Sequence, residues 1–210
     1  IASKNKPVLL ATGASDMNEV DVAMSILLQR TNDIVLMQCN TNYTASLGNF
    51  KYINLNVLKE YSRKYPDCVL GLSDHTPGHA TVLGAVALGA RVIEKHFTNN
   101  TNREGPDHKF SMDFNSWRNM VNRTRELENA LGSSTKRVEF NEKETVILQR
   151  RSIRTKKDLV IGDQIHENDI EFLRPCPEDA LPPYELEKIL NRELAEDIKS
   201  GDYLKWTSIK

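Results

Sequence analysis

Four short apolar segments recur along the first 132 residues of the chain, and each is followed, after a polar loop, by a stretch with helical periodicity. Segments that are apolar on both faces and alternate with helices are typical of a parallel sheet, because helices cover the faces of such a sheet. The predicted strands are residues 7–12, 33–39, 68–73 and 91–97, and the predicted helices are residues 17–28, 55–64, 78–88 and 116–131. This part of the chain is therefore predicted to be α/β, either an open four-stranded sheet or half of an eight-stranded barrel.

The rest of the chain follows a different pattern. Residues 133–144 are mostly small and charged, which is typical of a linker. Residues 145–210 combine short strand-like segments with a Gly162-Asp163 turn and have one helical stretch at 184–190. They are predicted to form a small, mostly β domain, whose roughly 65 residues lie near the lower limit for independent folding.

The composition excludes several classes of partner. Lys and Arg number 28 against 29 for Asp and Glu, so no overall positive field favours nucleic acid or an anionic membrane surface. No segment approaches the roughly 18 continuous apolar residues that span a bilayer, and the start of the chain lacks the pattern of a signal peptide. Cys39, Cys68 and Cys176 are widely spaced without a CxxC pair, which indicates small buried groups in a cytoplasmic protein.

Two neighbouring predicted strands each end in a histidine. His75 closes the third strand and His96 closes the fourth, so parallel strands should bring both imidazoles to the same edge of the sheet. Two imidazoles facing one space, with Asp74 and Glu94 beside them, indicate a divalent-cation site that keeps open positions for water or a substrate oxygen. The alternative is that each histidine only makes hydrogen bonds at its strand end. Thr76, followed by a proline, suits the N-cap of the next helix.

Three other segments carry candidate groups. Asp107 follows a Gly-Pro turn in the loop after the fourth strand, where its carboxylate is suited to a polyhydroxylated substrate or to local backbone amides. Tyr43, in the polar loop after the second strand, either faces the same space or serves in packing. RRSIRTKK, residues 150–157, is either an anion clamp or, as we favour, a strand edge protected by positive charge.

Five motifs along the chain match a known pattern. They are GLSDHTPGHATVLGAVALGARVIEKHFT from Gly71, GPDHKFSM from Gly105, RRSI from Arg150, LRP from Leu173 and DIKSGDYL from Asp197. Their order and spacing resemble the sialic acid synthase family, the bacterial N-acetylneuraminate synthases with their legionaminic and pseudaminic relatives. Members pair a (β/α)8 TIM barrel with a C-terminal antifreeze-like (SAF) domain. The resemblance implies that residues 1–132 are the second half of the barrel and residues 145–210 the SAF domain.

The resemblance also implies an activity. The family condenses phosphoenolpyruvate with an open-chain N-acetylated hexosamine, typically N-acetylmannosamine, giving a nine-carbon 2-keto acid and phosphate. By this likeness His75 and His96 hold a Mn²⁺ or Mg²⁺ ion that polarises the sugar aldehyde. The remaining assignments are catalytic Glu94 and Asp107, and substrate-binding Ser15, Tyr43, Ser73, Asp74 and Arg174. Arg174 is expected to reach from one subunit's SAF domain into the partner's barrel, so that a homodimer is the functional unit.

The chain departs from the family pattern at several positions. Thr41 stands where relatives often carry Asn or Ser, Thr44 begins TAS in place of PTP, and Cys176 and Asn191 each replace a glycine. The specific sugar therefore stays open, with a 6-phosphorylated or a diacetamido sugar as alternatives. The resemblance puts the phosphoenolpyruvate-binding lysines in four preceding βα units, so these residues alone are expected to be inactive. A non-catalytic sugar-binding or oligomerisation fragment is the alternative.

Overall fold

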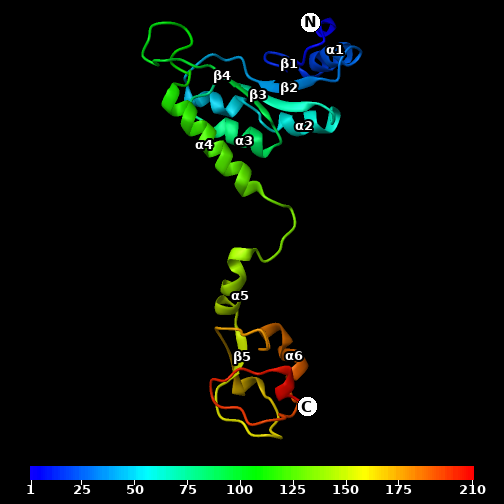
Figure 1. The fold of residues 1–210 in the computed structure, drawn as a ribbon, viewed down its shortest axis with the longest axis vertical. Helices are drawn as coiled ribbons and strands as arrows, with labels where there is room; N and C mark the ends of the chain where they lie inside the picture. The colour runs from blue at the N-terminus through cyan, green and yellow to red at the C-terminus, as the bar shows by residue number, and fades with distance from the viewer. The chain divides into compact units, whose positions relative to one another are not determined.

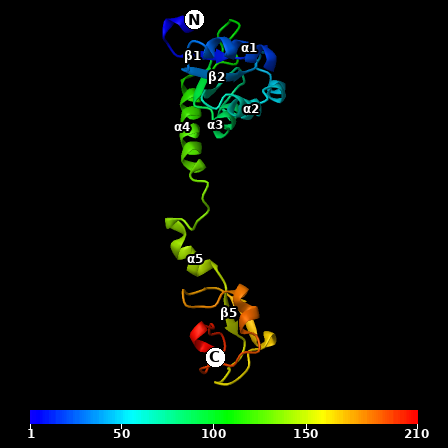
Figure 2. The same ribbon diagram turned by 90° about the vertical axis from the view of Figure 1, so that its right-hand side faces the viewer.

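The computed structural model describes residues 1–210, which divide into a first unit, Ile1–Ser133, and a second unit, Ser134–Lys210. Figures 1 and 2 show the first unit in blue to green, as a sheet with helices packed against it, and the second in yellow-green to red, with little regular structure. Each unit has its own hydrophobic core. The two are described separately below.

The first unit contains four βα units. Its elements are β1 (Val8–Ala11), α1 (Met17–Leu28), β2 (Ile34–Cys39), α2 (Val57–Lys64), β3 (Val69–Asp74), α3 (Ala80–Ala87), β4 (Val92–Lys95) and α4 (Phe114–Leu131), with 3-10 helices at Ala2–Lys4 and Leu47–Tyr52. The strands are parallel and lie in the order β1-β2-β3-β4. This confirms the predicted α/β alternation.

The consecutive strand order distinguishes between the two predicted arrangements. Right-handed crossovers between strands in consecutive order place every helix on the same face of the sheet. One buried core accordingly joins Met24 of α1, Leu58 of α2, Val82 of α3 and Met120 of α4 to Leu72 of β3. A doubly wound sheet would instead carry helices on both faces, so the sheet is a half-barrel.

The other face of the sheet carries rows of side chains that run across the strands. Leu9, Val35 and Val69 lie in one row, where Leu9 is 53% and Val69 44% exposed. Towards the carboxyl ends, the residues become polar. The next two rows in that direction are Ala11, Met37, Gly71 and Val92, and then Cys39, Ser73 and Glu94. Such layers across parallel strands are typical of the interior of a barrel.

The helix starts follow local capping rules, with one correction. Asp16 caps α1 in a capping box with Glu19. The prediction that Thr76 caps the next helix is wrong, because α3 begins at Ala80 with His79 at the N-cap. The hydroxyl of Thr76 bonds to a neighbouring carboxylate instead, and the chain turns at a glycine with a positive φ before the helix begins.

The second unit has little regular structure but a closed core. Its elements are α5 (Lys143–Gln149), β5 (Ser152–Thr155), β6 (Ile170–Leu173) and α6 (Leu186–Ile189), with 3-10 helices at Phe140–Glu142, Glu167–Asp169, Pro183–Glu185 and Trp206–Ser208. β5 and β6 form an antiparallel pair, and isolated bridges such as Leu159 with Ile198 extend the pairing. The core is aliphatic: Ile153, Leu159, Ile165, Ile170, Leu181, Ile189, Leu194, Ile198 and Leu204. These features confirm a small, mostly β unit with one short helical stretch.

Two of the glycine replacements noted in the sequence have a clear structural setting. Asn191 has a φ of 62°, in the left-handed region that a glycine would occupy without strain. Asparagine is among the few other residues that tolerate this conformation. Cys176 has no positive φ, so no glycine is required there. No helix in the structure is long and apolar enough to cross a membrane.

Candidate active site

The imidazoles of His75 and His96 lie beside each other at the carboxyl ends of β3 and β4. Their ring centres are 5.1 Å apart and their planes are inclined by 62°. His75 is 3% exposed as a residue, and the side chain of His96 is 30% exposed. The structure therefore brings together the two predicted metal ligands, one buried and one reachable from solvent.

Each imidazole has its Nδ1 atom directed to an oxygen. His75 Nδ1 donates to the carbonyl oxygen of Asn40 at 2.8 Å, and His96 Nδ1 lies 3.5 Å from Asp107 Oδ2. This leaves Nε2 of each ring available. Metal-binding histidines usually donate their other N–H to a carbonyl or carboxylate in this way, so the donor set fits a divalent cation. No group of three or more His, Cys, Asp or Glu residues surrounds a common point, so further ligands would be water or substrate.

Two aromatic rings pack against the histidines. The ring of Tyr43 is 4.2 Å from that of His75 and 5.6 Å from that of His96, centre to centre. Phe110, from the loop after β4, lies 5.0 Å from His96. Tyr43 is 51% exposed, so one side of its ring remains open to solvent. The predicted position of Tyr43 beside the histidines is therefore observed.

Below the histidines, a polar row crosses β2, β3 and β4. Ser73 donates its hydroxyl to Glu94 Oε1 at 2.8 Å, and Cys39 is paired with Ser73 in the strand register. Burial raises the pKa of the Cys39 thiol, which keeps it protonated at neutral pH. The row therefore contributes one carboxylate, a hydroxyl and a neutral thiol on the imidazole face.

The loop between β4 and α4 carries Asp107. This loop is closed at its base by backbone bonds between Thr98 and Met112 and between Met112 and His96. His108 bonds to the Thr98 hydroxyl at 2.8 Å, which gives that histidine a structural contact within the loop. The arrangement holds the Asp107 carboxylate beside His96, as predicted, and half exposed to solvent.

Asp74, predicted to bind substrate, lies on the other face of the sheet. Side chains alternate along a strand, so Ser73 and His75 face one side while Asp74 faces the helices. Its carboxylate is paired with Lys95, and both side chains are at most 1% exposed. The residue that sequence reasoning missed is Lys95. Alternation along the motif Glu94-Lys95-His96 would have indicated it, because a lysine between two site residues must point into the helix layer.

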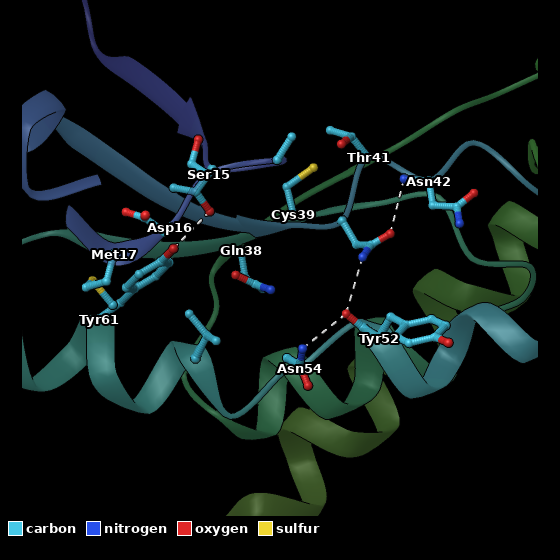
Figure 3. A pocket seen from close by; sticks show the side chains of 14 residues that line it. Ser15, Asp16, Met17, Gln38, Cys39, Thr41, Asn42, Tyr52, Asn54 and Tyr61 are labelled. Carbon is cyan, nitrogen blue, oxygen red and sulfur yellow. Dashed lines mark hydrogen bonds between the residues drawn. The ribbon is translucent and has the colours of Figure 1, made fainter. Parts of the chain in front are cut away.

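A polar cavity of about 570 Å³ lies beside the ends of β1 and β2 and holds Ser15, the predicted phosphate contact (Figure 3). Its lining comprises Thr12, Ala14, Ser15, Asp16, Met17, Gln38, Cys39, Asn40, Thr41, Asn42, Tyr52, Asn54, Val57 and Tyr61. Asp16 is the one formally charged residue among them. Tyr61 donates its hydroxyl to Thr12 at 2.9 Å, and burial raises the pKa of this phenol.

Asn40 links the cavity to the histidines. Its side chain accepts from the Asn42 N–H at 3.1 Å and donates to the Tyr52 carbonyl at 3.3 Å, as the dashed lines in Figure 3 show. Its own carbonyl oxygen holds His75. The loop that carries Tyr43 is thereby tied to both regions.

Arg174 belongs to the second unit, at the end of β6, and is exposed. No hydrogen bond or ion pair holds its guanidinium. The following Pro175 is anchored, because its carbonyl accepts from Ser152 at 2.9 Å and from Arg154 at 3.1 Å. Arg154 is thus half-buried and bonded, whereas the other cations of residues 150–157 are exposed, as a charged strand edge requires.

Comparisons with known proteins complete the description. Residues 1–136 match the model of the NeuB family, and residues 150–210 match the SAF domain. The chain is 36% identical over 214 residues to N,N'-diacetyllegionaminic acid synthase of Legionella pneumophila, covering 100% of this chain and 58% of that protein. It is 34% identical over 209 residues to pseudaminic acid synthase of Campylobacter jejuni, covering 98% of this chain and 58% of that protein.

A solved structure shows the same fold. N-acetylneuraminic acid (sialic acid) synthetase from Leptospira borgpetersenii, in complex with citrate, superposes with a TM-score of 0.61 at 28% identity over 69% of this chain and 50% of that one. The chain spans somewhat less than two thirds of the length of these relatives, 58% for each of the two enzymes above.

Proposed function

Because this chain belongs to the NeuB family, we propose that the full-length protein is a nonulosonate synthase. It condenses phosphoenolpyruvate with an N-acetylated hexosamine, releasing phosphate. The observation that carries the proposal is the meeting of His75, His96, Asp107 and the Ser73–Glu94 pair at one edge of the sheet. Relatives that share 36% and 34% identity with this chain are synthases of this class by name, which supports the same conclusion.

The imidazoles of His75 and His96 would hold a Mn²⁺ or Mg²⁺ ion through their free Nε2 atoms. When bound, such an ion supplies Lewis acidity to the aldehyde oxygen of the sugar. The carbonyl of Asn40 fixes the tautomer of His75, and the carboxylate of Asp107 orients His96. These two contacts keep both Nε2 lone pairs directed away from their own loops.

The proposed reaction forms one carbon–carbon bond and breaks one carbon–oxygen bond. Carbon 3 of phosphoenolpyruvate attacks the sugar aldehyde, water adds at carbon 2, and phosphate leaves from the tetrahedral intermediate. Glu94 and Asp107 are the carboxylates available on the imidazole face to accept or return protons. Tyr43 packs beside His75 and would contact the sugar, while Ser73 and Ser15 provide hydroxyls for phosphoenolpyruvate.

We also propose that the four βα units form the second half of a (β/α)8 barrel in the full-length protein. The consecutive strand order and the exposed Leu9 and Val69 on the face without helices support this proposal. No cation lines the cavity that contains Ser15. Groups that neutralise a phosphate there would therefore come from another part of the protein.

Arg174 is proposed to act across a homodimer. Its exposed guanidinium, free of internal partners, is suited to a carboxylate or a sugar of a partner's site. Mixed dimers of an Arg174→Ala chain with a His75→Ala chain are expected to recover part of the activity, because one complete composite site forms. Recovery no greater than that of either homodimer would place the whole site within one chain.

A diacetamido hexose is the second candidate for the sugar. The name of the Legionella relative, a diacetyllegionaminic acid synthase at 36% identity, favours it. N-acetylmannosamine and its 6-phosphate complete the set to be compared.

The test measures phosphate release by the full-length protein with phosphoenolpyruvate, Mn²⁺ and each of the three sugars. We expect release with one sugar to exceed the others clearly, and to stop when the metal is chelated. No phosphate from any sugar would refute the synthase and favour a non-catalytic sugar-binding or oligomerisation role.

A further inference from the structure

On the face of the sheet opposite the two imidazoles, Asp74 of β3 and Lys95 of β4 form an ion pair inside the protein. The two residues are directly paired in the register of the strands. Lys95 Nζ lies 2.6 Å from Asp74 Oδ2, and the two side chains are 1% and 0% exposed. Because neither side chain reaches solvent or the imidazole face, contact with a substrate does not explain the pair.

The polar atoms of the pair all have partners. Asp74 Oδ1 accepts from the N–H of Thr76 at 3.1 Å and from its hydroxyl at 2.9 Å, and Asp74 Oδ2 accepts from Thr81 at 2.6 Å. Lys95 Nζ also donates to the carbonyl of Thr76 at 2.7 Å. A buried ion pair adds little net stability over apolar side chains of the same volume, because desolvation offsets the attraction. A fully bonded network does fix the positions of its members.

What the network fixes is the residue that follows each charged side chain. His75 and His96 come directly after Asp74 and Lys95, and successive side chains of a strand point to opposite faces. The ammonium of Lys95 bonds on both sides of His75, to the carboxylate of the preceding residue and to the carbonyl of the following Thr76. The backbone around His75 is thus tied to the strand that ends in His96.

We infer that the Asp74–Lys95 pair is a positioning element that sets the separation of the His75 and His96 imidazoles, 5.1 Å between ring centres. The inference rests on the proposed function, in which these imidazoles hold a divalent cation. A cation with only two protein ligands is sensitive to their separation, because metal–nitrogen distances vary little. Neither member of the pair touches the cation, and both act through the histidines.

The test uses the full-length protein, with Mn²⁺ alone as the probe, and a variant that combines Asp74→Asn with Lys95→Met. The double change removes both charges together, so that no unpaired charge stays buried. The matched control combines Asp21→Asn with Lys64→Met. It makes the same chemical change in an ion pair of the same unit that joins α1 to α2 and adjoins neither imidazole.

Titration calorimetry is expected to show Mn²⁺ affinity about 10- to 100-fold lower in the Asp74/Lys95 variant and unchanged in the control, since groups that orient metal ligands have effects of this size. A crystal structure of the metal-free variant is expected to show a separation of ring centres different from 5.1 Å. A folded variant with unchanged Mn²⁺ affinity overturns the inference.

If the double variant does not fold, Thr81→Val is measured instead. It removes one donor to the Asp74 carboxylate and keeps both charges, and it is expected to lower Mn²⁺ affinity several-fold. Unchanged affinity in a folded Thr81→Val protein overturns the inference, since the network would then serve folding alone. Failure of the proposed function is distinct: a wild-type protein that binds no Mn²⁺, or His75→Ala that binds it equally well, refutes the metal site. The metal-free separation of the rings would still test the positioning role.

Discussion

The two units use their buried polar side chains differently. In the first unit, the buried polar groups at the strand ends bond largely to one another, as Asp74 does with Thr81, and they surround two imidazoles. In the second unit, the buried Ser152 and Thr155 donate to main-chain carbonyls of other segments. A hydroxyl that bonds to a distant carbonyl joins two segments of chain, whereas side chains that bond to each other at an open edge orient reactive groups.

This difference predicts where a mutation is felt. Polar substitutions at the strand ends of the first unit should reduce activity more than stability. Polar substitutions in the core of the second unit should reduce stability and leave the chemistry of the folded protein nearly intact. The four predictions below test this contrast, beginning with the largest expected effect.

His96→Ala should reduce turnover of the full-length protein by at least about 100-fold, because even residues that only orient metal ligands cost roughly 10- to 100-fold. The midpoint of thermal unfolding should change little, because the side chain is 30% exposed and sits at an edge. Steady-state kinetics with Mn²⁺ and a thermal melt are the measurements. His166→Ala, an exposed histidine of the second unit, is the control and should change neither. A His96→Ala protein that unfolds but still binds Mn²⁺ would reverse the assignment.

Thr155→Val should show the opposite behaviour. The residue is fully buried, and its hydroxyl donates to the Lys199 carbonyl at 2.8 Å. Valine has nearly the same shape but leaves that carbonyl unpaired, so the free energy of unfolding should fall by about 1–3 kcal/mol. Denaturant titration measures this loss, and turnover at a temperature where the protein is folded should not change. Thr207→Val, at an exposed threonine, is the matched control. A large loss of turnover without loss of stability would contradict the contrast.

The contrast also explains which parts of the fold could be predicted from the sequence. Helical periodicity located Met17–Leu28 without error, because each helix of the first unit is coded by a local pattern of apolar residues. Strand alternation located the histidines at one edge for the same reason. In the second unit, pairings such as Leu159 with Ile198 join residues far apart in the sequence, which no local pattern can indicate. Its fold was anticipated only from turn signals and a family resemblance.

The candidate site was predicted less completely than the fold. Types of residue and strand ends sufficed to group His75, His96 and Glu94, and the loop position sufficed for Asp107. The direction of Asp74 was missed because a residue next to two site residues was assumed to share their face. The link from Asn40 to His75 was not predictable, since it involves a main-chain carbonyl whose position depends on tertiary structure.

Asn191 offers a smaller test, one of backbone conformation rather than polar side chains. With a φ of 62°, Asn191→Ala should lower the free energy of unfolding by about 1 kcal/mol, because a Cβ is strained in the left-handed region and alanine lacks asparagine's tolerance of it. Asn191→Gly serves as the paired variant and should stay close to wild type. Equal stabilities for the alanine and glycine variants would mean that the left-handed conformation is not maintained in solution.

The smallest expected effect concerns an exposed ion pair of the second unit and its dependence on pH. The side chain of Lys199 and the N–H of Ser200 bond to Asp158 and hold the pKa of its carboxyl below the ordinary 3.8. A pKa lowered by folding means that the stabilisation is present above 3.8 and is lost as the pH falls through the folded value. Asp158→Asn should therefore lower the melting temperature slightly at neutral pH, and the two proteins should converge in acid.

Melting curves across this pH range measure the difference, with Asp202→Asn as the control, since the Asp202 side chain has no hydrogen bond or ion pair. Because Asp158 is exposed, salt should also reduce the difference at neutral pH. This small, salt-sensitive loss should leave turnover unchanged, as for the other substitutions in the second unit. A difference that persists unchanged in acid would instead assign the effect of Asp158 to packing, and the contrast between the units would then not depend on its charge.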